Sequence, residues 1–153
     1  MNIELRHNSY KTPLSEEKII STALENDKDE LELAVSRTFF DSDYDDPDLA
    51  PESDVGNDYQ SYFKEAFTEL SKHLGKPLFQ GNFDSPDFKQ WKSSVCPTAH
   101  VDQLVVWGDH SKKLYLRISQ LDKEGEIVVA FGAEGCECNI NQDFDYMASL
   151  YSK

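Results

Sequence analysis

A run of apolar residues between positions 59 and 74 predicts the longest helix of this chain and demands a surface on which that helix can pack. The apolar positions are Tyr59, Tyr62, Phe63, Ala66, Phe67, Leu70 and Leu74. They fall at i, i+3, i+4, i+7, i+8, i+11 and i+15, which is the spacing of one face of an amphipathic helix. Asn57 or Asp58 can cap its start, and Gly75 followed by Pro77 gives the expected end.

The pattern changes from helical to strand-like after residue 100. Three β-rich runs at 103–107, 113–119 and 126–131 are separated by short polar turns that contain glycine, and they predict an antiparallel meander. In the middle run, apolar and polar side chains alternate, as expected for a sheet that helices cover on one side. The apolar face carries Leu114, Leu116 and Ile118, and the other face carries Tyr115, Arg117 and Ser119. We expect the long helix to pack on the apolar face.

The first part of the chain also has helical features. Ser15 can cap a helix whose first turn is acidic. After a polar break at 26–29, apolar spacing resumes and continues to about Phe40. We interpret this part as two helices or one kinked helix, and the alternation of apolar residues over 31–35 leaves a short strand open.

Together these patterns predict an α+β fold in one domain, residues 1–153, with N-terminal helices packed on a C-terminal antiparallel β-meander. A chain of this length buries roughly 68–70% of its unfolded surface, enough for one core. Residues 78–80 can add an edge strand, whereas 82–98, interrupted by two prolines, is expected to be irregular. Residues 41–56 contain two prolines and a glycine without an apolar period, and they predict an acidic loop that can be mobile.

Negative charge is concentrated in one part of the chain. Residues 27–58 hold twelve acidic and two basic side chains, a net charge of −10 within a whole-chain charge of −14. Such a block repels itself and cannot build a core, so it is either a solvated linker or a surface for a partner of opposite sign. A sequence pI near 4.5 disfavours nucleic acid and anionic membranes as ligands. We therefore expect a basic protein as the partner.

The residues expected to contact that partner are Asp41, Asp43, Tyr44, Asp45, Asp46, Asp48, Glu52, Asp54 and Asp58. The aspartates supply attraction, and the ring of Tyr44 supplies contact area. An acidic helix around residues 27–32 is expected to lie beside them.

Two metal patterns are incomplete. Asp41, Asp43, Asp45 and Glu52 occupy positions 1, 3, 5 and 12 of a calcium loop, but position 6 lacks the required glycine. A second set could supply soft zinc ligands, although its spacings are atypical. Its members are Cys96, His100, Cys136 and Cys138. We expect no metal and no cofactor, and a small zinc-binding protein or Cys/His enzyme is the alternative.

Catalytic motifs are not evident either. Cys96 could pair with His100 or His110, but no nucleophile elbow, oxyanion motif or glycine-rich phosphate loop accompanies them. We therefore do not expect an enzyme. Three cysteines, two of them only two positions apart, do not form a disulfide framework. The N-terminus lacks the features of a secretory signal, and no run reaches ~20 apolar residues, so a cytoplasmic location is expected.

An acidic single-domain chain of this size, with uneven charge and no catalytic motif, resembles the immunity proteins that bacteria make against polymorphic or contact-delivered toxins. The segment from Leu104 to Gly132, with its runs LVVW, LYLRIS and EIVVAFG, is similar to small bacterial domains of unassigned role. The resemblance implies that the protein binds and blocks a cognate toxin, often a nuclease with a basic active site. A structural interaction domain of a larger complex is a further alternative.

Overall fold

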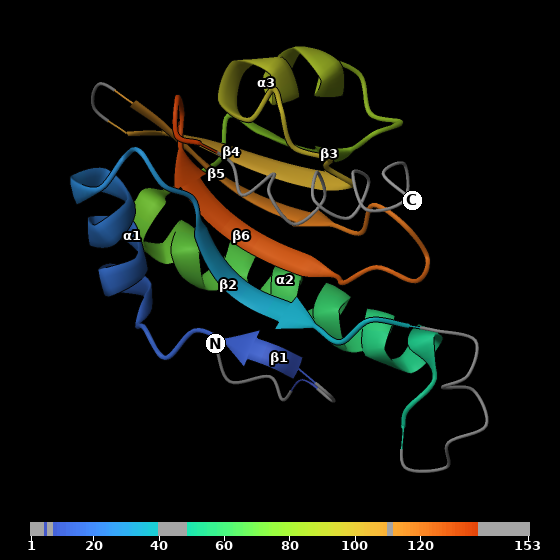
Figure 1. Ribbon diagram of the computed structural model, residues 1–153. Coiled ribbons are helices and arrows are strands. Elements are labelled where there is room, and N and C mark those ends of the chain that lie inside the picture. The colour runs from blue at the N-terminus through green and yellow to red at the C-terminus, as the bar shows by residue number, and fades with distance from the viewer. Residues whose placement is uncertain (1–4, 6–7, 40–48, 110–111, 138–153) are drawn as a thin grey trace.

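The fold is an antiparallel sheet with helices on both sides (Figure 1). The computed structural model describes residues 5, 8–39, 49–109 and 112–137. In this part of the chain six strands lie in the order β1-β2-β6-β5-β4-β3, and each neighbouring pair is antiparallel. The elements are β1 (Asn8–Lys11), α1 (Glu16–Glu25), β2 (Leu31–Ser36), α2 (Glu52–Leu74), β3 (Phe79–Asn82), α3 (Phe88–Val95), β4 (Gln103–Asp109), β5 (Lys112–Ser119) and β6 (Val128–Ala133).

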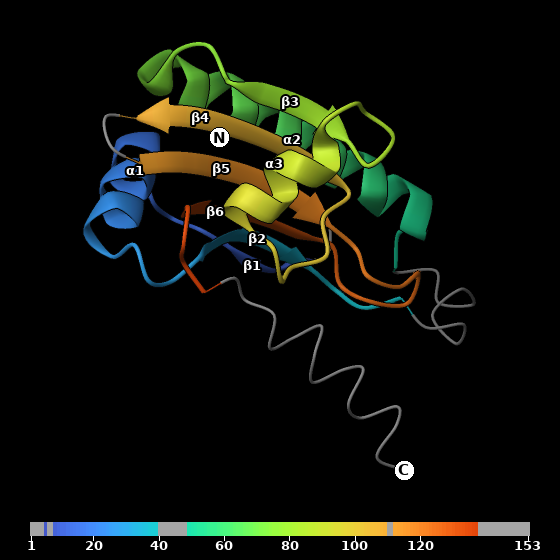
Figure 2. The ribbon, with the colours of Figure 1, turned by 90° about the horizontal axis from the view of Figure 1, so that it is seen from above.

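One face of the sheet is covered by α1 and α2 (Figures 1 and 2). Their apolar residues, including Ile19, Phe63 and Leu70, form one buried cluster with the inward side chains of the strands, among them Trp107 and Phe131. The helix predicted from the 59–74 spacing therefore packs where it was expected. The predicted cap of α1 is also confirmed, since the Ser15 hydroxyl accepts a hydrogen bond from the backbone N–H of Lys18 at 3.3 Å.

The opposite face of the sheet carries α3, which lies across β3, β4 and β5 (Figures 1 and 2). Here Phe88 and Val95 of α3 pack with Leu104 and Val106 of β4. The polar face of β5 is therefore buried as well, because Tyr115, Arg117 and Ser119 are only 0%, 2% and 3% exposed. The expectation that helices cover only one side of the sheet was wrong.

Several local predictions need correction. Residues 31–36 form a strand, which was the alternative to the preferred helix, because β2 pairs with β1 on one side and β6 on the other. The sequence did not indicate β1. Helix α2 begins at Glu52, so residues 52–56 are helical rather than part of the predicted loop. The region 82–98, expected to be irregular, contains α3.

The α+β class is confirmed, as are the predicted β4–β5–β6 meander and the edge strand, β3. The sheet is wider than a C-terminal meander, because β1 and β2 from the N-terminal part extend it beyond β6. Among the described residues, no helix has the length and apolar character needed to cross a membrane.

Candidate acidic binding end and a buried ion pair

The acidic residues predicted to bind a partner divide into two groups. Glu52, Asp54 and Asp58 lie in the first two turns of α2. Glu52 and Asp54 occupy the first turn, where negative charge interacts favourably with the helix dipole. The other predicted contact residues lie outside the described residues, and they are Asp41, Asp43, Tyr44, Asp45, Asp46 and Asp48. Three positions of the calcium pattern fall in that second group, while its fourth, Glu52, is helical.

The fold brings further carboxylates to the start of α2. The β5–β6 connection, residues 120–127, lies at the same end of the molecule as the first turns of α2 (Figure 1). The backbone of this connection is anchored, since the carbonyl of Glu124 accepts a hydrogen bond from the N–H of Phe39. The charge of Glu126 contributes to the raised pKa of Tyr59. We call this region the acidic end, and its carboxylates are Glu52, Asp54, Asp58, Asp102, Asp122, Glu124 and Glu126.

The influence of these carboxylates is visible at Tyr59, a buried residue of α2. Burial raises the pKa of its hydroxyl, and the neighbouring Tyr62, Asp58 and Glu126 add to the rise. Asp58 comes from the helix and Glu126 from the β5–β6 connection. The Tyr59 hydroxyl therefore lies within electrostatic range of both carboxylates.

Two basic side chains, Arg37 and Lys123, belong to the same part of the molecule. Arg37 already has local acceptors, because its guanidinium donates to the carbonyl oxygens of Thr38 at 2.6 Å and Ala50 at 2.9 Å. It also lies 4.6 Å from the ring centroid of Phe39. The seven carboxylates against these two cations leave a net charge of −5 at this end, so negative charge dominates its field.

A groove crosses the acidic end between α2 and the sheet. It consists of two adjoining pockets of about 450 and 270 Å³ that share Ser53, Gly56, Gln120 and Ile127. Asp102 lines it and is held in place by two contacts. Its carboxylate lies 2.9 Å from Nε2 of His100 and accepts the backbone N–H of Gln120 at 2.7 Å.

The prediction of an acidic helix over residues 27–32 was wrong. Helix α1 ends at Glu25, and residues from Leu31 onward form β2. Asp27 forms an ion pair with Lys112 at the start of β5. Glu30 is completely buried, with a side-chain exposure of 0%. These two acids therefore contribute to folding rather than to the acidic end.

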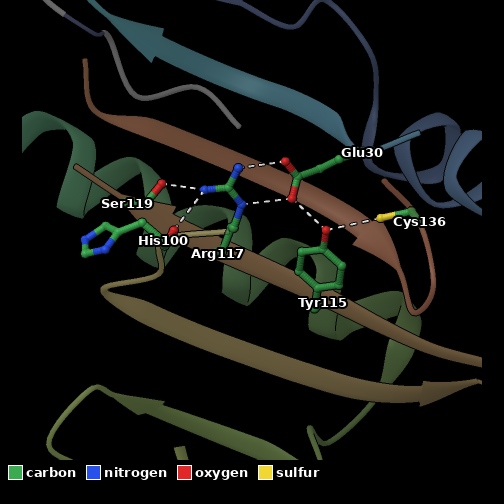
Figure 3. A network of polar contacts seen from close by, with 6 residues as sticks. All are labelled: Glu30, His100, Tyr115, Arg117, Ser119 and Cys136. Atoms are coloured by element: carbon green, nitrogen blue, oxygen red, sulfur yellow. Dashed lines mark hydrogen bonds and ion pairs between the residues drawn. The ribbon is translucent and has the colours of Figure 1, made fainter. Parts of the chain in front are cut away.

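Glu30 is the centre of a buried polar network on the α3 face of the sheet (Figure 3). Its carboxylate accepts two hydrogen bonds from Arg117, from Nε at 2.8 Å and from Nη2 at 2.7 Å. The Tyr115 hydroxyl donates a third at 2.6 Å. Such a bidentate pair is the arrangement that compensates the cost of burying two charges.

The rest of the network supplies acceptors for the remaining donor of Arg117. Its Nη1 donates to the Ser119 hydroxyl and to the backbone carbonyl of His100, and the Tyr115 hydroxyl lies 3.2 Å from Sγ of Cys136 (Figure 3). Burial by itself lowers the pKa of Arg117, but hydrogen bonding and charge pairing with Glu30 outweigh it, so the pKa is raised. Arg117 is therefore a permanent cation inside the protein.

Short backbone contacts explain how Glu30 reaches this position. The N–H of Glu30 donates to the carbonyl of Glu137, and the N–H of Glu137 donates to the carbonyl of Lys28. The segment before β2 is thereby attached to the segment after β6. Sequence reasoning missed this pair because it counted Glu30 with the solvated acids. A signal was present in β6, where Val128, Val129 and Ala130 are consecutive apolar residues, as in a strand buried on both faces.

The proposed zinc ligands do not form a metal site in the part of the chain that the structure describes. Cys96 and Cys136 are both buried in the cluster between α3 and the sheet, and Sγ of Cys136 lies 3.2 Å from the Tyr115 hydroxyl. The His100 ring is bonded to Asp102. Cys138 lies outside the described residues. Among those described, no group of three or more His, Cys, Asp and Glu side chains could hold a metal.

Comparisons with known proteins add no relative. No family model, curated protein or solved structure matches the chain.

Proposed function

We propose that the protein captures and neutralises a basic protein through its acidic end together with the acidic segment 41–48, and that this partner is a bacterial toxin. In this proposal the protein acts as an immunity protein in the cytoplasm of the producing cell. Its general resemblance to that class and its net charge of −14 both favour the assignment. A toxin that holds phosphates has a basic surface, which carboxylates attract.

The observation that carries the proposal is the gathering of carboxylates from distant parts of the chain. Glu52, Asp54 and Asp58 come from α2, whereas Asp102 and the acids of the β5–β6 connection come from the C-terminal half. A solvated linker would not require acids from the second half of the chain to lie beside it. Negative charge collected at one end steers a basic partner to that end and accelerates association.

The test begins with affinity capture of the partner from the native host, followed by purification of both proteins. We expect the dissociation constant to rise steeply with salt concentration, because exposed charges are screened. We also expect co-expression to protect cells from the partner. A captured partner that is acidic, or an affinity that does not change with salt, would contradict the proposal.

A matched pair of variants locates the surface. The variant Glu52→Lys/Asp58→Lys reverses two charges at the acidic end, and Glu17→Lys/Glu25→Lys makes the same change on α1, away from the start of α2 (Figure 1). Glu52 and Glu17 both lie in the first turn of a helix, so the loss of their favourable interaction with the helix dipole is similar. The first variant should weaken binding about 10-fold or more, equivalent to about 1.4 kcal/mol, and the second should bind nearly as the wild type does.

A further inference from the structure

The groove at the acidic end has a lining that is partly apolar and partly negative. Ile118 and Ile127, near the ends of β5 and of the β5–β6 connection, belong to the core and are only 3% and 5% exposed, so their accessible edges form the apolar floor of the groove. Glu52 lines one of its two pockets, and Asp102 lines the other. No basic side chain is found among the described residues that line it. An occupant with an aliphatic body and a positively charged tip would match this lining.

Gly56 keeps the groove open on the helix side. It lies within α2, yet a Cβ added to it would meet no atom within 4 Å apart from the helix's own backbone. Glycine inside a helix is less stable than alanine, and this glycine relieves no crowding among the described residues. Its effect is to leave the helix backbone bare where the two pockets join, so that a long side chain can approach.

We propose that the groove receives one cationic side chain of the basic partner, an arginine or a lysine. This inference rests on the proposed function and identifies the contact within it. The aliphatic stem would lie along Ile118 and Ile127, and the charged head would reach a carboxylate at either end. Arginine and lysine commonly bury their stems in this way while the charge stays near polar groups. Both oxygens of Asp102 keep a lone pair after their contacts with His100 and Gln120.

The test uses amino-acid amides as probes, so it does not depend on finding the partner. Backbone amide spectra of the full chain are recorded while N-acetylargininamide, N-acetyllysinamide or neutral N-acetylnorleucinamide is added. A cationic amide should shift the signals of Gly56, Ser119 and Gln120 at concentrations on the order of millimolar, and the neutral one should shift them far less. The arginine and lysine titrations show which head group is preferred.

Variants at Gly56 locate the effect. Gly56→Trp should fill the groove and abolish the shifts without changing any charge, whereas Gly56→Ala should keep them. Thr68→Trp places the same side chain at an exposed position later in α2 and should bind as the wild type does. Asp102→Asn should weaken the response to the cationic amides.

The outcomes separate the two proposals. The groove assignment is overturned if the cationic amides shift these signals no more than the neutral amide does, or if their shifts persist in Gly56→Trp. The proposed function is decided separately by the Glu52→Lys/Asp58→Lys variant and the purified partner. Loss of partner binding in that variant, with full binding in Gly56→Trp, would leave the acidic end as the interface and exclude the groove.

Discussion

The two faces of the sheet are equally buried but are stabilised in different ways. Strand β5 contributes to both, with Leu116 on the α1 and α2 face and Arg117 on the α3 face, and both residues are at most 2% exposed. The first face is a mainly apolar cluster. The second contains an ion pair whose acceptors and donors are matched one to one. Burial alone therefore does not tell which physical effect holds a surface together.

The difference lies in how each face responds to damage. Apolar packing is non-directional and loses free energy roughly in proportion to the area removed. A buried charge behaves differently, because removal of one partner leaves the other desolvated and unpaired. The α3 face should therefore be the more sensitive to small chemical changes, and its pair joins the segment before β2 to β5.

The largest expected effect comes from Glu30→Ala, which leaves the Arg117 cation buried without its carboxylate. The free energy of unfolding should fall by about 3–5 kcal/mol, measured by urea denaturation. Glu69→Ala is the control, because Glu69 pairs with Lys72 at 2.8 Å on the exposed side of α2. That surface pair should contribute less than about 1 kcal/mol. Equal losses in the two variants would remove the distinction between buried and exposed pairs.

A second variant asks whether charge is needed on the α3 face at all. Glu30→Leu/Arg117→Met removes both charges and keeps apolar volume. Replacement of a whole buried pair is often neutral or even stabilising by about 1–4 kcal/mol, although here Ser119 and the His100 carbonyl also lose a donor. We expect the double variant to be more stable than Glu30→Ala by about 2 kcal/mol. If the double variant is less stable than Glu30→Ala, the ion pair stabilises the fold by more than the mutual compensation of its two charges.

A tyrosine-to-phenylalanine substitution on each face of the sheet gives a smaller expected change in stability and a more direct comparison of the two faces. Tyr115→Phe removes a hydroxyl that donates to Glu30 at 2.6 Å and should cost about 1.5–3 kcal/mol, as for hydrogen bonds to charged groups. Tyr59 is 0% exposed, and within the described part of the chain its hydroxyl has no hydrogen-bond partner. Tyr59→Phe should therefore leave stability unchanged or increase it slightly. Thermal unfolding of both variants measures the contrast, and a loss in Tyr59→Phe as large as in Tyr115→Phe would refute it.

The sequence predicted the elements that depend on local pattern. The strands β4 to β6 are β-rich runs joined by short turns, and α2 has an apolar stripe, so each could be identified without knowledge of its partners. The strand β2 could be named only as an alternative to a helix, because its apolar spacing fits both, and pairing with β6, far away in the sequence, decides for the strand. The short helix α3 lies between two prolines that suggested a loop.

The acidic end and the Glu30–Arg117 pair also differ in how far the sequence predicted them. The acidity of the chain indicated a charged surface, but only the fold adds Asp102 and the acids of the β5–β6 connection to it. Glu30 was counted as a solvated acid because composition cannot tell an exposed carboxylate from a paired one. Besides the apolar run of β6, the presence of Arg117 in the middle strand, with apolar neighbours on each side, was a local indication that a buried acid would be needed.

The smallest effect concerns alkaline pH and the helical face. Burial raises the pKa of Tyr59 and of Tyr62 above the ordinary value of 10.0. Well below pH 10 both hydroxyls are neutral in the folded and unfolded states, so they contribute no pH dependence. Above pH 10 the unfolded state releases protons that the folded state retains, and stability falls by about 0.8 kcal/mol per tyrosine at pH 10.5. Urea denaturation at pH 9 and pH 10.5 measures how much the free energy of unfolding decreases between the two pH values. The decrease caused by these two tyrosines should be complete in the wild type, halved in Tyr59→Phe and absent in Tyr59→Phe/Tyr62→Phe. If the double variant loses as much stability as the wild type, other groups cause the decrease at alkaline pH, and the buried tyrosines of the α1 and α2 face do not contribute to it.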